Sequence, residues 1–171
     1  MLERYATVDA ALQHPELFWG VRFVMLADRK ETAWVEGGLQ GEVRIRRQQN
    51  GVLAHTNHYL SDDLTAQNEK YYESSHKRYD RVMELLKAQK QHTLDDFIRI
   101  GEDRTAGPVN SLWRTGDETS HTQTVAQMVV WLQPDGDFTV YVKYRAAADD
   151  AGHEQTVRLT KQEIFGSAVN K

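Results

Sequence analysis

Apolar residues fall in short runs along the chain, and the first three runs have the composition of β-strands. They are rich in Val, Ile, Phe and Trp, and polar or glycine-containing breaks separate them. These strands are predicted at 21–29, 31–37 and 42–49. The dipeptide Asn50-Gly51 tolerates the positive φ angles of a type I′ turn, so we expect a hairpin there. Residues 52–60 are therefore predicted to return antiparallel as a fourth strand.

The spacing of apolar residues changes to steps of three and four residues in the middle of the chain. We expect a helix that starts at Asp62 or Asp63 and runs to about Ala88, with an apolar stripe along one side. Thr93 is a good N-cap for a second helix, TLDDFIRIGE, because a threonine hydroxyl accepts hydrogen bonds from the first helical N–H groups. A short helix at 7–12 precedes the first strand.

Strand patterns return in the last third of the chain. The segments 123–132 and 138–145 flank Pro-Asp-Gly-Asp, which is typical of a tight turn because proline fixes φ and glycine accepts the left-handed conformation. Further strands are expected at 111–114 and 153–160. Two groups of strands with helices between them predict an α+β fold, a mainly antiparallel sheet with helices packed on it. With no internal repeat or linker, we expect residues 1–171 to form a single domain.

The composition excludes several classes of protein. A net charge of −4 disfavours binding to nucleic acid or to an anionic membrane. No apolar run approaches the length of a membrane span, and the N-terminus does not resemble a secretory signal. The chain has no cysteine, which removes disulfides, thiolate metal sites and a cysteine nucleophile within these residues. We expect a cytoplasmic protein with no cofactor.

The segment 51–60, GVLAHTNHYL, holds the first candidate residues for chemistry. On a strand His55 and His58 point to opposite faces, so we expect no shared metal ion. The Asn57 side chain has two uncharged N–H donors, which can stabilise a developing oxyanion. Alternatively, Asn57 caps the strand or closes a turn, and the residue types alone favour this structural alternative.

Other polar groups allow a binding or a structural interpretation. Ser74 and Ser75 lie one turn from Arg78 on the predicted helix, where they could hold an anion or form an ordinary solvated face. The strip RIRR at 44–47 could contact a phosphate or carboxylate, but a solvated edge strand is the better interpretation. No GxSxG motif supports a Ser-His-Asp triad.

The segment GVLAHTNHYL resembles the "TNH" segment of the acyl-coenzyme A:6-aminopenicillanic acid acyltransferase-like family. These are N-terminal-nucleophile (Ntn) hydrolases related to the choloylglycine hydrolases, which cleave linear amide C–N bonds. Upstream, the resemblance includes Ala27, Asp28 and Glu36. Downstream, it includes the serine pair with Arg78 and Arg81, and the hairpin TQTVAQMVVWLQPDGDFTVYV at 122–142.

The resemblance implies a fold like the C-terminal part of an Ntn-hydrolase αββα sandwich. It also implies that Asn57 helps to form the oxyanion hole of an acyl-transfer site. We expect the substrate, a small-molecule amide, to be bound around it by His55, Thr56, His58 and Arg78.

The chain departs from the family pattern at its start. Members carry a nucleophilic N-terminal cysteine, and nothing in MLERYATV replaces it. We therefore expect a truncated, C-terminal portion that is inactive alone. Its expected partner is a separate chain carrying the nucleophile half, or a second copy that forms a homodimer through open sheet edges. The alternative is a non-catalytic domain that binds a small molecule or dimerises.

Overall fold

The computed structural model describes residues 4–68, 73–145 and 153–166. Its internal contacts divide the chain into two compact units, Met1–Asp80 and Arg81–Lys171. The division falls within helix α2 (Glu73–Lys87), and each unit is described by itself below. The single-domain organisation stays a prediction.

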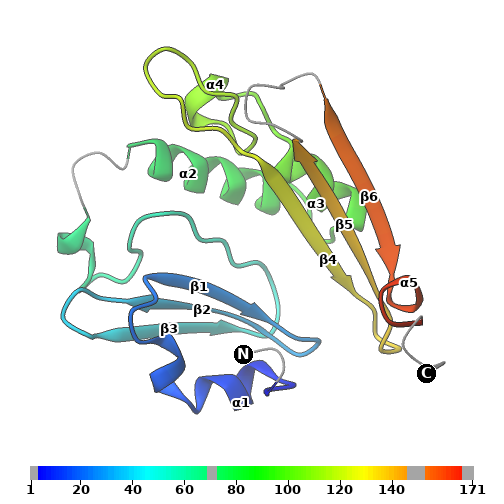
Figure 1. Ribbon diagram of the computed structural model, residues 1–171. Coiled ribbons are helices and arrows are strands. Elements are labelled where there is room, and N and C mark those ends of the chain that lie inside the picture. Colours follow the sequence, from blue (N-terminus) through cyan, green and yellow to red (C-terminus); the bar gives the residue numbers. More distant parts are fainter. Residues whose placement is uncertain (1–3, 69–72, 146–152, 167–171) are drawn as a thin grey trace. The chain divides into compact units, whose positions relative to one another are not determined.

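Unit 1 contains an antiparallel sheet with the strand order β1-β2-β3 (Figure 1). Its strands are β1 (Phe23–Ala27), β2 (Thr32–Gly37) and β3 (Val43–Gln48), as the sequence predicts. The central strand β2 is the most buried because it has a neighbour on each side. Phe23 pairs with Glu36 and Met25 with Trp34, so these four side chains share one face of the sheet.

Helix α1 (Val8–Leu12) is followed by the 3₁₀ helix η1 (Pro15–Phe18). The Val8 N–H at the start of α1 donates to the Asp28 carboxylate at 2.8 Å, which fastens the helix to the end of β1. Arg47 on β3 adds an ion pair to Asp9 at 2.9 Å. Val8, Ala11 and Phe18 are buried as part of the core of this unit.

The prediction of a fourth strand at 52–60 is wrong. Gly51 has a φ of 109°, but Asn50 does not have the positive φ that a type I′ turn requires. The segment 52–60 forms no strand, because side chains rather than β3 accept the hydrogen bonds of its backbone. The Tyr59 N–H donates to Asn68 Oδ1 at 2.7 Å, and the Leu60 N–H donates to Glu36 Oε1 at 2.5 Å.

Helix α2 starts later than Asp62 or Asp63. The 3₁₀ helix η2 (Thr65–Gln67) precedes it, and the part of the predicted helix at 69–72 lies outside the described residues. Asn68 has an extended backbone and bonds Tyr59 through both of its amide atoms, which holds this point of the chain out of a helix. The predicted end near Ala88 is confirmed.

Unit 2 contains a second antiparallel sheet, with the order β4-β5-β6 (Figure 1). Its strands are β4 (Ala126–Leu132), β5 (Phe138–Arg145) and β6 (Glu154–Thr160). The predicted hairpin between β4 and β5 is confirmed, with Gly136 at a φ of 99°. Gln127 on β4 donates to the carbonyl groups of Phe97 and Ile98 in helix α3 (Leu94–Gly101), which covers one face of this sheet.

Two helices of unit 2 begin at well-formed side-chain caps. Thr93 and Asp96 make a capping box at the start of α3, as the Thr93 prediction requires. Thr160 and Glu163 make a second capping box for α5 (Lys161–Phe165), while α4 (Gly107–Asn110) has no side-chain cap.

The predicted strand at 111–114 is wrong, because this segment serves to bury Trp113. The Trp113 N–H bonds the Asp103 carbonyl at 3.0 Å, and its indole donates to Glu154 Oε1 at 2.9 Å. Arg104, Lys143 and Arg145 lie against the indole ring, and each also pairs with Glu154. The indole ring is fully buried among these charged side chains.

The fold is α+β, as the sequence predicts. Two antiparallel three-stranded sheets and five α-helices account for its regular structure within the described residues. None of the helices in that part of the chain has the length and apolar character needed to cross a bilayer.

Candidate functional site

Glu36 is a carboxylate that follows the apolar residues Ala33, Trp34 and Val35 in β2, and it is fully buried. Its Oε1 accepts from the Leu60 N–H at 2.5 Å and lies 2.8 Å from His55 Nε2, while its Oε2 accepts from the Ser61 N–H at 2.9 Å. Burial alone raises the pKa of Glu36, but the hydrogen bonds from Ser61, Leu60 and His55 outweigh it and lower the pKa below its ordinary value. The ionised carboxylate therefore fastens both ends of the segment 55–61 to β2.

The His55 ring is buried against the same face of the sheet. Its centroid lies 4.8 Å from that of Phe23 and 5.6 Å from that of Trp34. Nδ1 lies 2.6 Å from the Thr56 carbonyl oxygen, and Nε2 faces Glu36. Both ring nitrogens are thus engaged within unit 1, which makes His55 a tie between the segment and β2.

Ser75 on α2 holds the middle of the segment. It is buried, and its Oγ accepts from the Asn57 N–H at 2.7 Å and donates to Thr56 Oγ1 at 3.0 Å. The Thr56 hydroxyl in turn donates to the Ser75 carbonyl oxygen at 3.0 Å. Helix α2 therefore fixes the backbone on which Asn57 stands.

His58 completes this network as a neutral donor. Its Nδ1 lies 2.9 Å from Ser75 Oγ and 3.1 Å from Thr56 Oγ1, whose hydrogens are already used, so Nδ1 carries the proton. Burial, followed by the charges of His76 and His55, lowers the pKa of His58 to about 4. Since Ser75 does not donate to this ring, the pair is not a nucleophile activated by a base.

Asn57 differs from its neighbours because its side chain is exposed. Arg78 Nη2 donates to Asn57 Oδ1 at 3.1 Å. A guanidinium group has only donors, so the amide must turn its oxygen toward Arg78 and its Nδ2 away from it. Within the part of the chain that the structure describes, Asn57 Nδ2 has no hydrogen-bond partner, and it can donate to an incoming oxygen.

The structure brings Thr56, Asn57, His58 and Arg78 together around the first turns of α2, whereas His55 faces β2. The sequence did not predict that Glu36 and Ser75 hold the segment 55–61 in place. One signal was available for Glu36, an acidic residue that follows Ala33, Trp34 and Val35 in a buried strand.

The other polar candidates form internal ion pairs. Arg44 pairs with Asp63, and Arg47 pairs with Glu31 as well as with Asp9. Arg81 pairs with Asp103 at 2.7 Å. The described residues contain no group of three or more metal-binding side chains that could hold an ion.

The protein therefore has an α+β fold in which the side-chain amide of Asn57 is exposed. Helix α2 and the buried Glu36 carboxylate hold the segment that carries this amide and so orient its donor. The chain belongs to the acyl-coenzyme A:6-aminopenicillanic acid acyl-transferase family, which is Ntn-hydrolase-like, because the model of that family matches residues 2–145. A search of curated proteins gave no match. The resemblance identified from GVLAHTNHYL is confirmed, and the roles of the individual site residues stay predictions.

Proposed function

We propose that this chain supplies the oxyanion-binding part of a site that hydrolyses or transfers acyl groups at linear amide C–N bonds. Asn57 Nδ2 is the donor to the oxyanion, and Arg78 is a positioning residue that sets the direction of the amide. Thr56 and His58 line the approach of a small-molecule amide, and His55 acts through its tie to Glu36.

The observation that supports this proposal most directly is the hydrogen bond from Arg78 Nη2 to Asn57 Oδ1. An oxyanion hole needs donors that are fixed before the charge develops, because reorientation during the reaction has an energetic cost. The backbone of Asn57 is held by Ser75 and its amide oxygen by Arg78, so its free donor has a fixed direction.

We propose that the nucleophile is a cysteine outside these 171 residues, since they contain none. We propose that the chain alone does not hydrolyse amides and that a separate polypeptide provides the nucleophile half. A homodimer through open sheet edges, in the cytoplasm, is the other assembly that we propose.

The donor role is tested by NMR on the ¹⁵N-labelled chain, titrated with phenylphosphonate as a tetrahedral oxyanion mimic. We expect the side-chain NH₂ signals of Asn57 to shift on titration. The matched variant is Asn57→Asp. Its side chain can still accept a hydrogen bond from Arg78 but has no N–H group to donate to the oxyanion. It is expected to abolish the response of the neighbouring Thr56 and His58 amides, and an unchanged response would exclude Asn57 as the donor.

The inactivity of the isolated chain is tested separately with N-acyl amino acid and penicillin amides. No hydrolysis is expected from the wild-type chain. Hydrolysis that Asn57→Ala abolishes would instead show that the chain carries a complete active site. In any assembly that does hydrolyse amides, Asn57→Asp is expected to lower kcat on the order of a hundredfold or more, the usual cost of a lost oxyanion donor.

The alternative function is a non-catalytic domain that binds a small molecule or dimerises. An apolar pocket in unit 1, whose lining does not include Asn57, favours this alternative. The two proposals differ in the phosphonate titration, because a domain in which Asn57 is only structural has no reason to bind an oxyanion there.

A further inference from the structure

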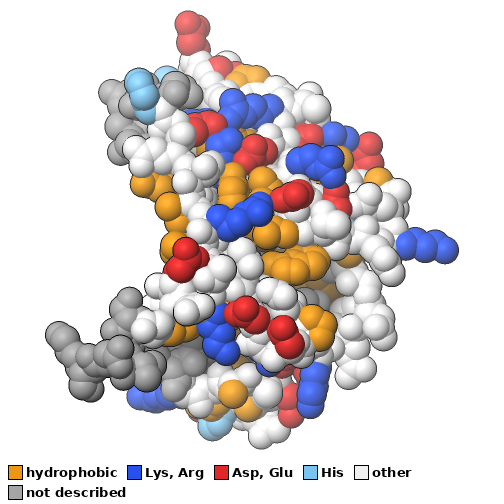
Figure 2. All heavy atoms as spheres, turned by 90° about the vertical axis from the view of Figure 1, so that its right-hand side faces the viewer, with side chains coloured by type: hydrophobic (Ala, Val, Ile, Leu, Met, Phe, Trp, Pro, Cys, Tyr) orange, Lys and Arg blue, Asp and Glu red, His pale blue; other side chains and the backbone are white. Residues whose placement is uncertain are grey.

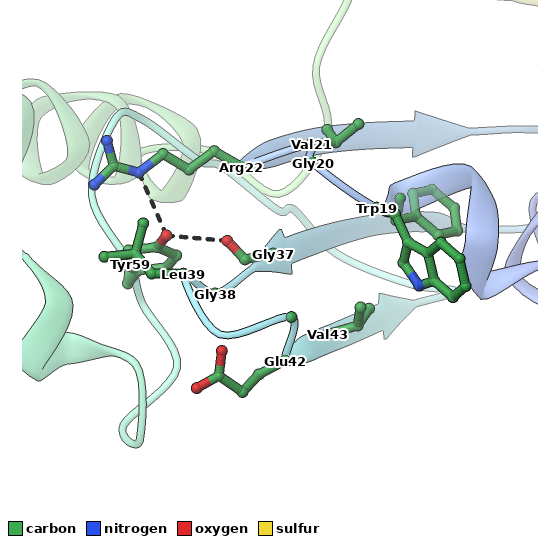
Figure 3. Close-up of a pocket in the computed structure, with 12 residues that line it drawn as sticks. Trp19, Gly20, Val21, Arg22, Gly37, Gly38, Leu39, Glu42, Val43 and Tyr59 are labelled. Atoms are coloured by element: carbon green, nitrogen blue, oxygen red, sulfur yellow. Dashed lines mark hydrogen bonds between the residues drawn. The ribbon is translucent and has the colours of Figure 1, made fainter.

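Unit 1 has a pocket of about 600 Å³ at one end of its sheet, where β1 begins, β2 ends and β3 begins (Figure 3). Pockets that bind small molecules have volumes of about 300–1,000 Å³ and mostly apolar linings. Large apolar or aromatic side chains make up most of the lining that is not glycine. They are Phe18, Trp19, Val21, Leu39, Val43 and Tyr59.

Glycines allow the pocket wall to form. A Cβ on Gly37 would lie 2.2 Å from the Val21 carbonyl oxygen, and one on Gly38 would lie 2.3 Å from Glu42 Oε2 and 3.1 Å from Leu64 Cδ2. The Tyr59 hydroxyl donates to the Gly37 carbonyl at 3.0 Å, which holds the Tyr59 ring against the end of β2 (Figure 3). At Gly37 the wall is therefore built by close backbone packing, whereas the close contact of Gly38 is with the end of the Glu42 side chain.

Two large hydrophobic side chains remain exposed at the pocket. Trp19 is 73% exposed and Leu39 is 74% exposed, whereas Phe18 and Tyr59 beside them are buried. Figure 3 places Trp19 at the opposite end of the pocket from Tyr59. Removing this apolar surface from water is favourable, and an apolar ligand group in the pocket would do so.

The charged residues of the lining already have partners. Arg22 donates through Nε to the Tyr59 hydroxyl at 3.3 Å, and its guanidinium group lies 5.3 Å from the centroid of the Tyr59 ring. Glu42 accepts from the Gln40 N–H at 2.9 Å and from Gln67 Nε2 at 3.4 Å. One positive and one negative group leave no net charge in the lining, so it complements an uncharged ligand better than an ion.

We propose that this pocket binds the uncharged apolar part of a small molecule, an alkyl chain or an aryl ring. Binding here requires no contribution from Asn57 and no amide chemistry, so the pocket functions whether or not the chain takes part in catalysis. Tyr59 nevertheless lies two residues after Asn57, in the segment that Glu36 holds.

The test is an NMR titration of the labelled chain with 1-butanol, 1-hexanol, 1-octanol and benzyl alcohol. We expect saturable shifts of the Gly37 and Gly38 amides. Affinity is expected to rise about fourfold for each added methylene, the fold-change that corresponds to about 0.8 kcal/mol per buried CH₂. Hexanoate and hexylammonium are expected to bind at least tenfold more weakly than 1-hexanol. Comparison of benzyl alcohol with 1-hexanol distinguishes an aryl from an alkyl ligand.

Trp19→Ala and Leu39→Ala remove exposed side chains, so both variants are expected to fold, and each to weaken 1-octanol binding about tenfold. Met128→Ala in unit 2 is the matched control, because Met128 is 69% exposed on β4, and it is expected to leave binding unchanged. The proposal is overturned if Met128→Ala weakens binding as much as Trp19→Ala. It is also overturned if the charged probes bind as well as the alcohols, or if no saturable shift occurs.

Discussion

The Glu36 carboxylate joins separate parts of one segment, because His55, Leu60 and Ser61 all bond to it. Removal of the carboxylate leaves buried donors without an acceptor. We expect Glu36→Ala to lower the free energy of unfolding by about 3 kcal/mol or more, because each buried donor left without an acceptor costs about 1–3 kcal/mol. Glu36→Gln keeps the shape and one acceptor oxygen, so it is expected to cost less. Urea denaturation measures the free energy of unfolding of both variants. An equal decrease in the two variants would contradict a role for the charge of Glu36.

His58 gives stability a defined dependence on pH. Its pKa is about 4 in the folded chain and ordinarily 6.5, so between these values the unfolded chain binds a proton that the folded chain does not. Stability from the neutral ring is therefore complete above pH 6.5. It falls by up to about 1.4 kcal/mol per pH unit as the pH decreases toward 4.

His58→Asn is expected to remove this part of the pH dependence, because its amide N–H can replace Nδ1–H as a donor and does not titrate. The exposed His121→Asn is the control and is expected to retain the wild-type slope. Unfolding free energies measured from pH 7 to pH 4 compare the three proteins. A wild-type slope in His58→Asn would assign the acid sensitivity to other groups.

Among the elements, α3 shows how a short helix is stabilised by its first turn. Thr93 accepts from the Asp96 N–H, and Asp96 bonds the Thr93 N–H, which also holds the Asp96 pKa well below its ordinary value. Thr93→Ala is expected to cost about 1 kcal/mol, the typical value for a lost N-cap. Thr93→Ser keeps the hydroxyl and is expected to be nearly neutral in thermal denaturation. A similar loss in both variants would contradict the capping role.

The elements that could be predicted from the sequence are those whose signals are local. The strands of both sheets follow from composition and from turns such as the one at Gly136, and α3 follows from Thr93. The segment 52–60 could not be predicted, because its backbone donors bond Glu36, Asn68 and Ser75, which are 9 to 24 positions away. Likewise Trp113 bonds Glu154 across 41 positions.

In the candidate site, too, contacts between residues far apart in the sequence could not be predicted. A side-chain amide with donors could be recognised at Asn57, but its orientation depends on Arg78, which is 21 positions away on α2. The type of a residue shows what it can donate. Only the fold shows which of its atoms are already bonded and which remain available.

At the scale of the whole molecule, a homodimer through open sheet edges stays a prediction. The strand order leaves β1, β3, β4 and β6 as edges, and their side chains differ in charge. β3 carries Arg44, Arg46 and Arg47, whereas β4 carries no charged residue. Charged side chains on an edge strand discourage pairing with another chain. The edge strand β1 is also without charge but has five residues against seven in β4, so β4 is the edge at which we expect two copies to meet.

Sedimentation equilibrium tests this assembly. Val130→Lys on β4 is expected to shift the protein toward the monomer. Ile45→Lys on β3 is expected to have little effect, although the two residues are similarly exposed at 46% and 44%. A wild-type chain that remains monomeric at high concentration would contradict the homodimer.

The composition of β4 also affects how the protein behaves in concentrated solution. Its seven residues, AQMVVWL, contain no charge, proline or glycine, and Met128 and Val130 are exposed on one face. Figure 2 shows that hydrophobic side chains also reach the surface between charged ones. Segments of this kind are typical of cross-β aggregation when an edge is open. Salts such as sulfate strengthen apolar association. They are therefore expected to promote thioflavin-binding aggregates of the wild-type chain at lower protein concentration than of Val130→Lys.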